Sequence, residues 1–216
     1  MPNRPLVSEQ YAEQSRRWHD DVRASDRVLD TDGLATERVV LLARHGQTAD
    51  NAEGRILGRR DPALTAIGCA QAERLAAALA GAGVAAVWTS PLRRALATAE
   101  IVAGALGLAP TVLDDLVESA RGRWEGRAVG EIARTAPQLH AAFVSGDPAF
   151  AFPGGESLRE QRRRTARALA VVVAGPLPAL VVAHAGTIRA ALALHGHPVP
   201  PESAVAHGEI VARLAV

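Results

Sequence analysis

Three short, continuously apolar runs constrain the fold of this chain more than any other feature of its sequence. They cover residues 39–43, 84–88 and 179–183. Each is valine-rich and has the length expected of a strand that is covered on both faces of a sheet. Sheets of that kind are built from parallel strands, and parallel strands need long connections that are usually helical.

Helical patterns lie where such connections are required. Thr65 is placed to cap the first helix, and Ser90 with Pro91 provides a cap and a first-turn proline for the second. The predicted helices cover 66–79, 91–106, a segment from 156–157 toward 173, and a segment from 186–187 onward. The alternation of strands and helices predicts an α/β fold, a three-layer sandwich in which a mainly parallel central sheet carries helices on both faces.

A change of composition near residue 38 divides the chain. Residues 1–37 are rich in charge and poor in aliphatic side chains, whereas 38–216 is rich in Ala, Val and Leu. Tyr11, Trp18 and Val22 recur at helical spacing in the first part. We predict an extension over 1–37 that is partly helical or disordered, and one folded domain over 38–216. A helix in the extension would pack on the domain or on a partner chain, which leaves a homodimer open.

The charge composition excludes several classes of function. The 24 basic residues nearly balance 23 acidic ones, for a net charge of +1, so the chain lacks the basic footprint of a nucleic-acid-binding protein. All of the basic residues are arginine, which removes P-loop and Schiff-base chemistry, because both need a lysine amine. A bound phosphate would therefore be held by guanidinium groups.

Two further features predict a cytoplasmic protein that does not enter a membrane. The longest apolar stretch, 168–183, is interrupted by Gly175, Pro176 and Pro178, so it favours a helix end, a turn and a strand over a membrane span. The single cysteine, Cys69, excludes an internal disulfide, which suits a reducing compartment.

Polar residues that suit a phosphate follow all three predicted strands. Arg44 and His45 follow the first, Arg94 lies beyond the second, and His184 follows the third. Ligands of open α/β sheets bind at the carboxyl ends of the strands. Arginine binds phosphate oxygens in a bidentate manner, and histidine can act as nucleophile or donor. Gly46 permits a close backbone approach, and a helix opening at 186–187 adds amide donors.

These residues belong to a series of motifs that resembles the histidine phosphatase superfamily, also called the phosphoglycerate mutase-like fold. The motifs are Arg44-His45-Gly46-Gln47-Thr48 with Asn51, Ser90-Pro91-Leu92-Arg93-Arg94, Leu116-Val117-Glu118 with Gly122 and Trp124, Pro153-Gly154-Gly155-Glu156-Ser157, and Ala183-His184-Ala185-Gly186. They occur in the family order and cover roughly residues 38–216.

The resemblance implies a phosphatase of this superfamily that acts on a small phosphorylated metabolite and needs neither a metal nor a cofactor. His45 would be the nucleophile, with Arg44, Arg94 and His184 around the phosphoryl group, and Glu118 would be the general acid and base. A carboxyl with a raised pKa suits that role; burial favours such a pKa and nearby arginines oppose it. The substrate-binding residues implied are Gly46, Gln47, Thr48, Asn51, Ala185 and Gly186.

Two other functions stay open. A phosphoglycerate mutase would use the same histidine, but mutases of this family carry a longer insertion after the acid than the compact segment between Glu118 and His184 provides. A regulatory module that binds a phosphorylated ligand on the same fold is the other alternative. Two departures from the family pattern leave specificity open. Leu57 stands where many relatives carry glutamine, and the segment after Glu118 lacks the acidic residue that relatives often place two positions beyond the acid and carries Arg121 nearby.

We expect no functional role for the remaining polar candidates. His195 and His197 lack a third ligand at metal-site spacing, so no metal is predicted. The run of arginines at 162–164 suits the solvated side of a helix. His140 and His207 have no supporting motif.

Overall fold

A computed structural model describes residues 34–197, 199 and 205–216, and its centre is a five-stranded sheet. The strands are β1 (Val39–Arg44), β2 (Ala86–Thr89), β3 (Pro110–Val112), β4 (Ala179–Ala183) and β5 (Ile210–Ala215). Their spatial order is β3-β2-β4-β1-β5. All neighbours are parallel except β1 and β5, which are antiparallel. The β1 and β4 strands are buried along almost their whole length, as their continuous apolar sequences predict.

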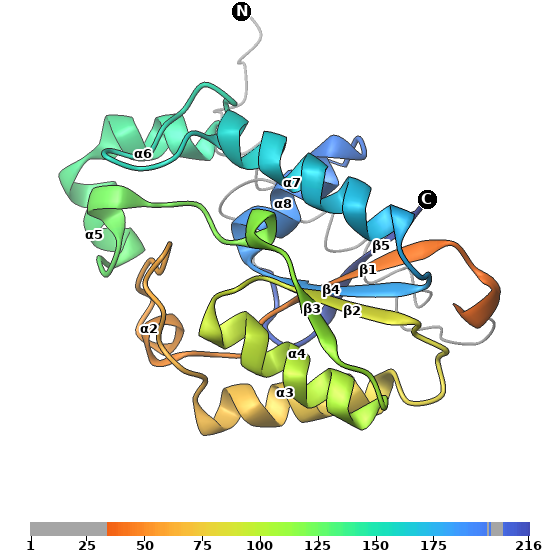
Figure 1. Cartoon of the computed structure of the whole chain (residues 1–216). Coiled ribbons are helices and arrows are strands. Elements are labelled where there is room, and N and C mark those ends of the chain that lie inside the picture. Colours follow the sequence, from red (N-terminus) through yellow and green to blue (C-terminus); the bar gives the residue numbers. More distant parts are fainter. Residues whose placement is uncertain (1–33, 198, 200–204) are drawn as a thin grey trace, which may run out of the picture.

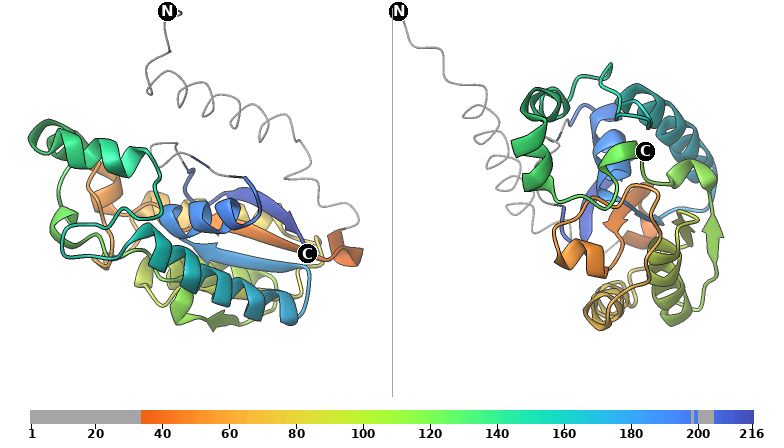
Figure 2. Two further views of the ribbon diagram at one scale, coloured as in Figure 1. Left: turned by 90° about the horizontal axis from the view of Figure 1, so that it is seen from above. Right: turned by 90° about the vertical axis from the view of Figure 1, so that its left-hand side faces the viewer.

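Helices cover both faces of this sheet, which confirms the predicted sandwich (Figures 1 and 2). On one face, α3 (Ala66–Ala78) and α4 (Arg93–Ala105) pack through Leu75 and Val102 on side chains such as Leu41. On the other face, α7 (Leu158–Ala174) and α8 (Ala185–Leu194) pack in a second cluster with the alternate side chains of β1. Among the described helices, none is long and apolar enough to cross a membrane.

Smaller elements gather beyond the carboxyl ends of the parallel strands (Figure 1). They are α2 (Ala49–Ala52), α5 (Val129–Thr135) and α6 (Pro137–Val144), together with the 3-10 turns η3 (Asp114–Leu116) and η4 (Gly122–Trp124). Their interior is a separate aromatic group, which we call the cap cluster: Trp124, Ile132, Phe150 and Phe152, with Ile56, Leu139, Phe143 and Leu158 packed against it.

Helix boundaries agree with the sequence in one case and correct it in another. Thr65 caps α3, because its side chain accepts a hydrogen bond from the amide of Gly68. The predicted cap of α4 is wrong: that helix begins at Arg93, and its N-cap residue Leu92 makes no side-chain cap bond. The Ser90 hydroxyl accepts a hydrogen bond from the Leu92 amide at 3.2 Å, just before the helix, and also bonds a histidine of the site described below.

The start of the described chain already packs on the sheet. Leu34, in the 3-10 turn η2 (Leu34–Thr36), is only 2% exposed and belongs to the same buried cluster as Leu41. Glu37 pairs with Arg213 of β5. The body of the fold therefore extends a few residues before the predicted boundary at 38, while the extension over 1–33 lies outside the described residues.

Candidate active site

His45 directly follows β1, and its protonation state is set by its two hydrogen bonds. Its Nδ1 lies 2.7 Å from the carbonyl oxygen of Gly46, and its Nε2 lies 3.2 Å from Nε of Arg94. An arginine Nε always donates, so Nε2 accepts and Nδ1 carries the proton. Burial, His184 and the nearby arginines lower the pKa of His45 well below its ordinary value. The ring is thus neutral, and a lone pair sits on Nε2.

Two arginines surround this ring. Arg94 is fully buried, and its terminal nitrogens donate to the carbonyl oxygens of Arg60 at 2.6 Å and Gly58 at 3.0 Å. Arg44 donates from one terminal nitrogen to the carbonyl oxygen of Val205 at 2.6 Å, and its Nε is buried without a hydrogen-bond partner. Both guanidinium groups are held by backbone carbonyls, so their positive charge is fixed beside His45.

His184 lies at the same end of the sheet as His45, because it directly follows β4 and is the N-cap residue of α8. Its ring centroid is 5.2 Å from that of His45, and its Nε2 is 2.7 Å from Oγ of Ser90. Nδ1 of His184 is buried without a partner, like Nε of Arg44. A buried polar nitrogen without a partner costs about 1–3 kcal/mol, so two of them beside His45 mark a place suited to an anion with several acceptor oxygens.

Glu118 is 6% exposed, and donors surround both of its carboxylate oxygens. The amides of Ser119 and Gly186 donate to it at 2.7 and 2.9 Å, Nε2 of Gln161 donates at 3.0 Å, and the Arg121 guanidinium lies 3.6 Å away. Burial raises the pKa of Glu118, but Arg121, the two amides and Arg94 outweigh it and lower that pKa to about 2. Of the two opposing effects expected from the sequence, the nearby arginines thus prevail over burial, and the carboxyl lacks the raised pKa that suits a general acid.

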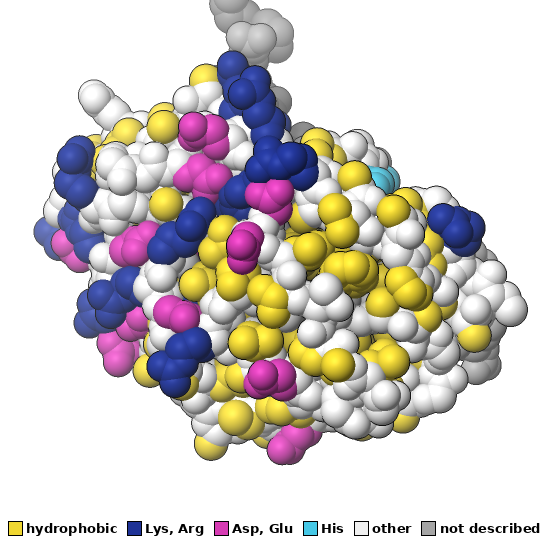
Figure 3. Space-filling view, in the orientation of Figure 1, with side chains coloured by type: hydrophobic (Ala, Val, Ile, Leu, Met, Phe, Trp, Pro, Cys, Tyr) yellow, Lys and Arg dark blue, Asp and Glu magenta, His cyan; other side chains and the backbone are white. Residues whose placement is uncertain are grey.

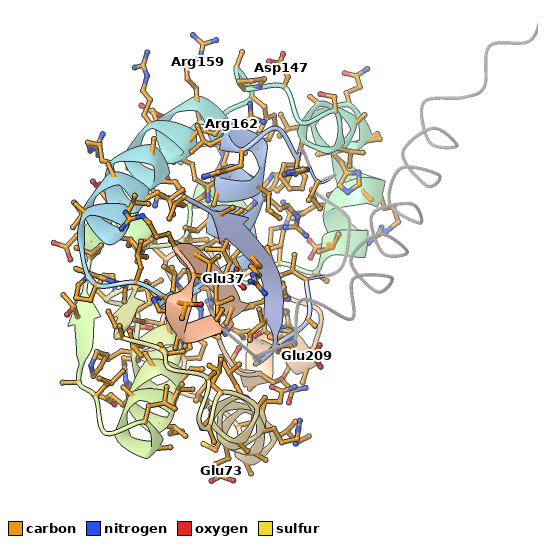
Figure 4. The ribbon with its side chains drawn as sticks, turned by 90° about the vertical axis from the view of Figure 1, so that its right-hand side faces the viewer. Glu37, Glu73, Asp147, Arg159, Arg162 and Glu209 are labelled. Atoms are coloured by element: carbon orange, nitrogen blue, oxygen red, sulfur yellow. The ribbon has the colours of Figure 1, made fainter. Side chains whose placement is uncertain are left out.

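The loop that carries Glu118 is anchored by an arginine that the sequence placed in solvent. Arg164 pairs through two nitrogens with Glu156 at 2.7 and 2.9 Å and donates to the carbonyl oxygens of Asp115 and Val117. It is only 7% exposed, so the expectation of a solvated run at 162–164 is wrong for this residue. Arg163 and the nearby Arg159 are exposed, and Figure 4 shows Arg159 projecting away from the body.

The predicted substrate-binding residues divide into two groups. Asn51 and Ala185 line the cavity next to His45. The amides of Gly46, Gln47 and Thr48 instead bond within the protein, to side-chain oxygens of Thr98, Gln71 and Asn51 respectively.

The close backbone approach at Gly46 is made to a helix of the protein. A side chain at Gly46 would lie 2.3 Å from the carbonyl oxygen of Gly68 in α3. The Gly186 amide is occupied by Glu118, as described above. The glycines therefore shape the site, and the donors next to His45 come mainly from side chains.

These residues open into a cavity of about 350 Å³. Arg44, His45, Arg94 and Glu118 lie along it together with Arg55, Arg121, His140 and Arg189. The rest of its wall is largely apolar and comes from the cap cluster and the residues around it: Ile56, Leu57, Trp124, Val129, Ile132, Phe143 and Val144. Figure 3 shows arginine side chains gathered on the side of the molecule where α5 and α6 lie.

Sequence reasoning missed two histidines and two supporting residues of this site. His140 lines the cavity, and the His207 ring packs on that of His45 with centroids 5.6 Å apart. Gln161 and Arg164 reach Glu118 and its loop from α7. None belongs to a motif, and a contact between distant segments leaves no trace in sequence spacing. His195 bonds the carbonyl oxygen of Ala191, and the described residues contain no group of three or more metal-ligating side chains.

Comparison with known proteins assigns the family. Residues 40–207 match the description "Histidine phosphatase superfamily (branch 1)", which is more than half of the chain. The chain belongs to this superfamily, and the class of protein expected from its motifs is confirmed.

Three similar proteins show the range within that family. The bifunctional protein Rv2228c of Mycobacterium tuberculosis is 40% identical over 167 residues, which is 76% of this chain but 46% of the relative's length. The probable phosphoglycerate mutase GpmB of Yersinia pestis is 36% identical over 60% of each protein. A solved structure of mycobacterial glucosyl-3-phosphoglycerate phosphatase Rv2419c, in complex with VO3, has a TM-score of 0.68 and 32% identity, and covers 75% of this chain and 84% of that one. The chain thus spans about half the length of the curated relative Rv2228c.

Proposed function

We propose that this chain is a metal-independent phosphomonoesterase that acts on a small phosphorylated metabolite through a phosphohistidine intermediate. The observation that carries the proposal is the state of His45: a neutral ring whose proton is fixed on Nδ1 and whose Nε2 lone pair faces Arg94. A neutral imidazole so oriented is a nucleophile, and fixed arginines supply the charge that a phosphoryl transition state requires.

In the first step, Nε2 of His45 attacks phosphorus and the bond to the leaving oxygen breaks. Arg94 then donates to a phosphoryl oxygen instead of to Nε2, while Arg44 and His184 present the nitrogens that lack protein partners. Glu118 passes a proton to the leaving oxygen. Since the pKa of this carboxyl is about 2 in the free protein, the proton arrives with the substrate, bound as its monoanion.

In the second step, water attacks the phosphohistidine and the Nε2–phosphorus bond breaks. Glu118, now ionised, accepts a proton from that water, and His45 returns to its neutral state. The proton on Glu118 then passes to the phosphate, which leaves as its monoanion, and the carboxylate is ionised again. The arginines around the phosphoryl group take the place that a metal ion occupies in other phosphoryl-transfer sites, so we expect activity to survive chelation by EDTA.

The proposal extends to the setting of the reaction. The substrate is a phosphate ester small enough for the cavity, and the chain works in the cytoplasm without nucleic acid or a membrane as partner. The domain begins a few residues before residue 38 and includes Leu34, and a homodimer is compatible with it. The similarity to a probable phosphoglycerate mutase gives the second candidate, transfer of the phosphoryl group to an acceptor hydroxyl instead of to water.

The experiment is to follow phosphate release and enzyme labelling in parallel. The protein is mixed with an activated aryl phosphate carrying labelled phosphorus and quenched in alkali, where phosphohistidine survives. We expect labelled protein and free phosphate from the natural sequence, and neither from His45→Ala. His197→Ala, which alters an exposed histidine outside the cavity, is the matched control.

Full activity in His45→Ala would refute the covalent route. Conversion of 3-phosphoglycerate to its 2-isomer with little phosphate release, and only with a bisphosphorylated primer, would favour the mutase instead.

A further inference from the structure

A third histidine packs against the proposed nucleophile. The ring of His207 meets that of His45 edge to face, with centroids 5.6 Å apart and planes inclined by 67°. His184 lies at a similar distance, 5.2 Å, with its plane inclined by 55°. His45 therefore has two imidazole neighbours, and only His184 belongs to the family motifs.

The segment that carries His207 is tied by two hydrogen bonds to Arg44, the last residue of β1. The Val205 carbonyl oxygen accepts a hydrogen bond from Arg44 at 2.6 Å, and the Gly208 amide donates to the Arg44 carbonyl oxygen at 2.9 Å. Gly208 adopts a φ of +62°, a left-handed conformation that glycine adopts without strain. These contacts on both sides of His207 set its position against His45.

The ring of His207 is neutral in this setting. Burial, and secondarily the charge of Arg44, lower its pKa to about 3. Its Nε2 is buried and makes no hydrogen bond to any residue that the structure describes, so the side chain contributes a ring surface and no charge. A neutral neighbour can touch His45 without adding to the positive charge of the two arginines already there.

The need for such a neighbour follows from what His45 must do. A histidine ring rotates about χ2 in a broad torsional well, so one hydrogen bond at Nδ1 leaves its plane loosely defined. In the free protein Arg94 holds the other nitrogen, but that contact is given up when Arg94 turns to the phosphoryl group. At the moment of attack, the hydrogen bond at Nδ1 remains, and the rings of His184 and His207 still lie against the ring.

We propose that His207 is a positioning residue, whose ring holds the His45 imidazole in the orientation that presents Nε2 to phosphorus. This inference rests on the proposed function. It assigns His207 a role through His45 and no contact with the substrate. The contact is one of packing, so another flat ring should replace it.

The test compares His207→Ala with His207→Phe and His207→Gln. A nucleophile misplaced by about 1 Å can cost 10²-fold in rate, so we expect single-turnover labelling of His45 by an activated aryl phosphate to slow by about 10–100-fold in His207→Ala and His207→Gln. His207→Phe should restore most of that rate. Inhibition by inorganic phosphate should stay unchanged in all three, because the anion donors are untouched. His197→Ala is the control.

A second measurement does not depend on activity. The Nδ1 proton of His45, bonded to the Gly46 carbonyl, should give a slowly exchanging downfield proton resonance in the natural protein and in His207→Phe, and a broadened one in His207→Ala. Labelling of His207→Ala at the natural rate with that resonance intact would overturn the proposal. So would a His207→Phe variant as slow as His207→Ala, since the nitrogen rather than the ring would then matter. If the natural protein transfers no phosphoryl group at all, the proposed function fails, and the resonance still decides whether His207 orders His45.

Discussion

At the scale of single residues, Glu118 combines two demands that oppose each other. A proton donor needs a carboxyl that holds its proton near neutral pH, yet Arg121 and two backbone amides stabilise the charged form and lower the pKa of Glu118 to about 2. When the bound monoanion passes its proton to Glu118, the phosphoryl group becomes dianionic and offsets the arginine charge, so substrate binding itself raises the pKa of Glu118. The residue becomes an acid only when there is a leaving group to protonate.

This gives a prediction about pH and leaving group. The second ionisation of a phosphate ester lies near pH 6, so the monoanion that carries the proton becomes scarce above it. We expect kcat/KM for an alkyl phosphate to fall above about pH 6 and that for an activated aryl phosphate, whose leaving group needs no proton, to fall much less. Glu118→Gln should slow single-turnover labelling of His45 by the alkyl substrate by about 10²–10⁴-fold and spare labelling by the aryl one, while hydrolysis of the phosphohistidine slows for both. Equal losses in the labelling rate with both substrates would contradict the role of Glu118 as the acid.

Gly186 supports a second prediction at this scale. A Cβ there would lie 2.3 Å from Oε1 of Glu118 and 2.8 Å from side-chain nitrogens of Arg121 and Gln161. Gly186→Ala must therefore push the carboxylate out of place. The effect should appear chiefly as a loss of kcat for an alkyl phosphate and only secondarily as a lower melting temperature. Gly104→Ala, at an exposed helical glycine with nothing within 4 Å, is the matched control. Natural kinetics in Gly186→Ala would mean that the position of Glu118 is not critical.

Which residues the sequence could predict depends on how local their contacts are. His45, Arg44, Arg94, Glu118 and His184 lie in contiguous motifs, and the structure brings all five to one place, although their catalytic roles stay a prediction. The pKa of Glu118 depends on burial, on Arg121 and Arg94, and on the amides of Ser119 and Gly186, and no spacing rule reports that sum.

At the scale of elements, the strands and helices with strong periodicity were predicted and the short ones were not. The runs that form β1, β2 and β4 are continuous and apolar, whereas β3 has three residues and β5 contains Arg213. The short helices α5 and α6 surround an alanine-proline junction and bury few side chains of their own. Their structure depends on aromatic residues brought in from elsewhere in the chain.

That dependence can be tested by removing one ring of the cap cluster. Phe152 is 2% exposed, packs on Trp124 with centroids 5.3 Å apart, and lies under the Arg121 guanidinium at 4.3 Å. Phe152→Ala should lower the free energy of unfolding by about 3–5 kcal/mol. Hydrogen exchange should show the loss in the amides of α5 and α6 first, with the amides of β1 and β4 protected as before.

The control for this variant is Val171→Ala, an exposed position on α7, which should change neither set of amides. Uniform loss of protection across the sheet in Phe152→Ala would show that the cap and the sheet unfold as one unit.

At the scale of the whole molecule, the buried titratable residues of the site make the folded protein less stable in acid. His45 and His184 have folded-state pKa values well below 6.5, chiefly because of burial, while in the unfolded chain they titrate near 6.5. Below pH 6.5 the unfolded state binds protons that the folded state does not bind. The free energy of unfolding should therefore decrease as the pH is lowered, by up to about 1.4 kcal/mol per pH unit for each histidine. Glu118 acts in the same direction, and its contribution is lost between about pH 4.5 and 2.

Urea denaturation at pH 7, 6 and 5 measures this slope. A His45→Gln, His184→Asn double variant should show a flatter dependence, and His197→Asn should keep the natural one. A free energy of unfolding that is constant from pH 7 to 5 would mean that the two rings are not held neutral.

The cap cluster has a consequence for how this protein can change over evolution. It shares no residue with the two clusters that flank the sheet, although three of its side chains, Trp124, Ile132 and Phe143, form part of the cavity wall. Substitutions at sites that share no partners add nearly independently. Mutations in the cap cluster can therefore reshape the cavity wall while the nucleophile, its arginines and the sheet beneath them keep their geometry. A lineage built this way can acquire new substrates by single steps, each of which passes through a folded and chemically competent protein.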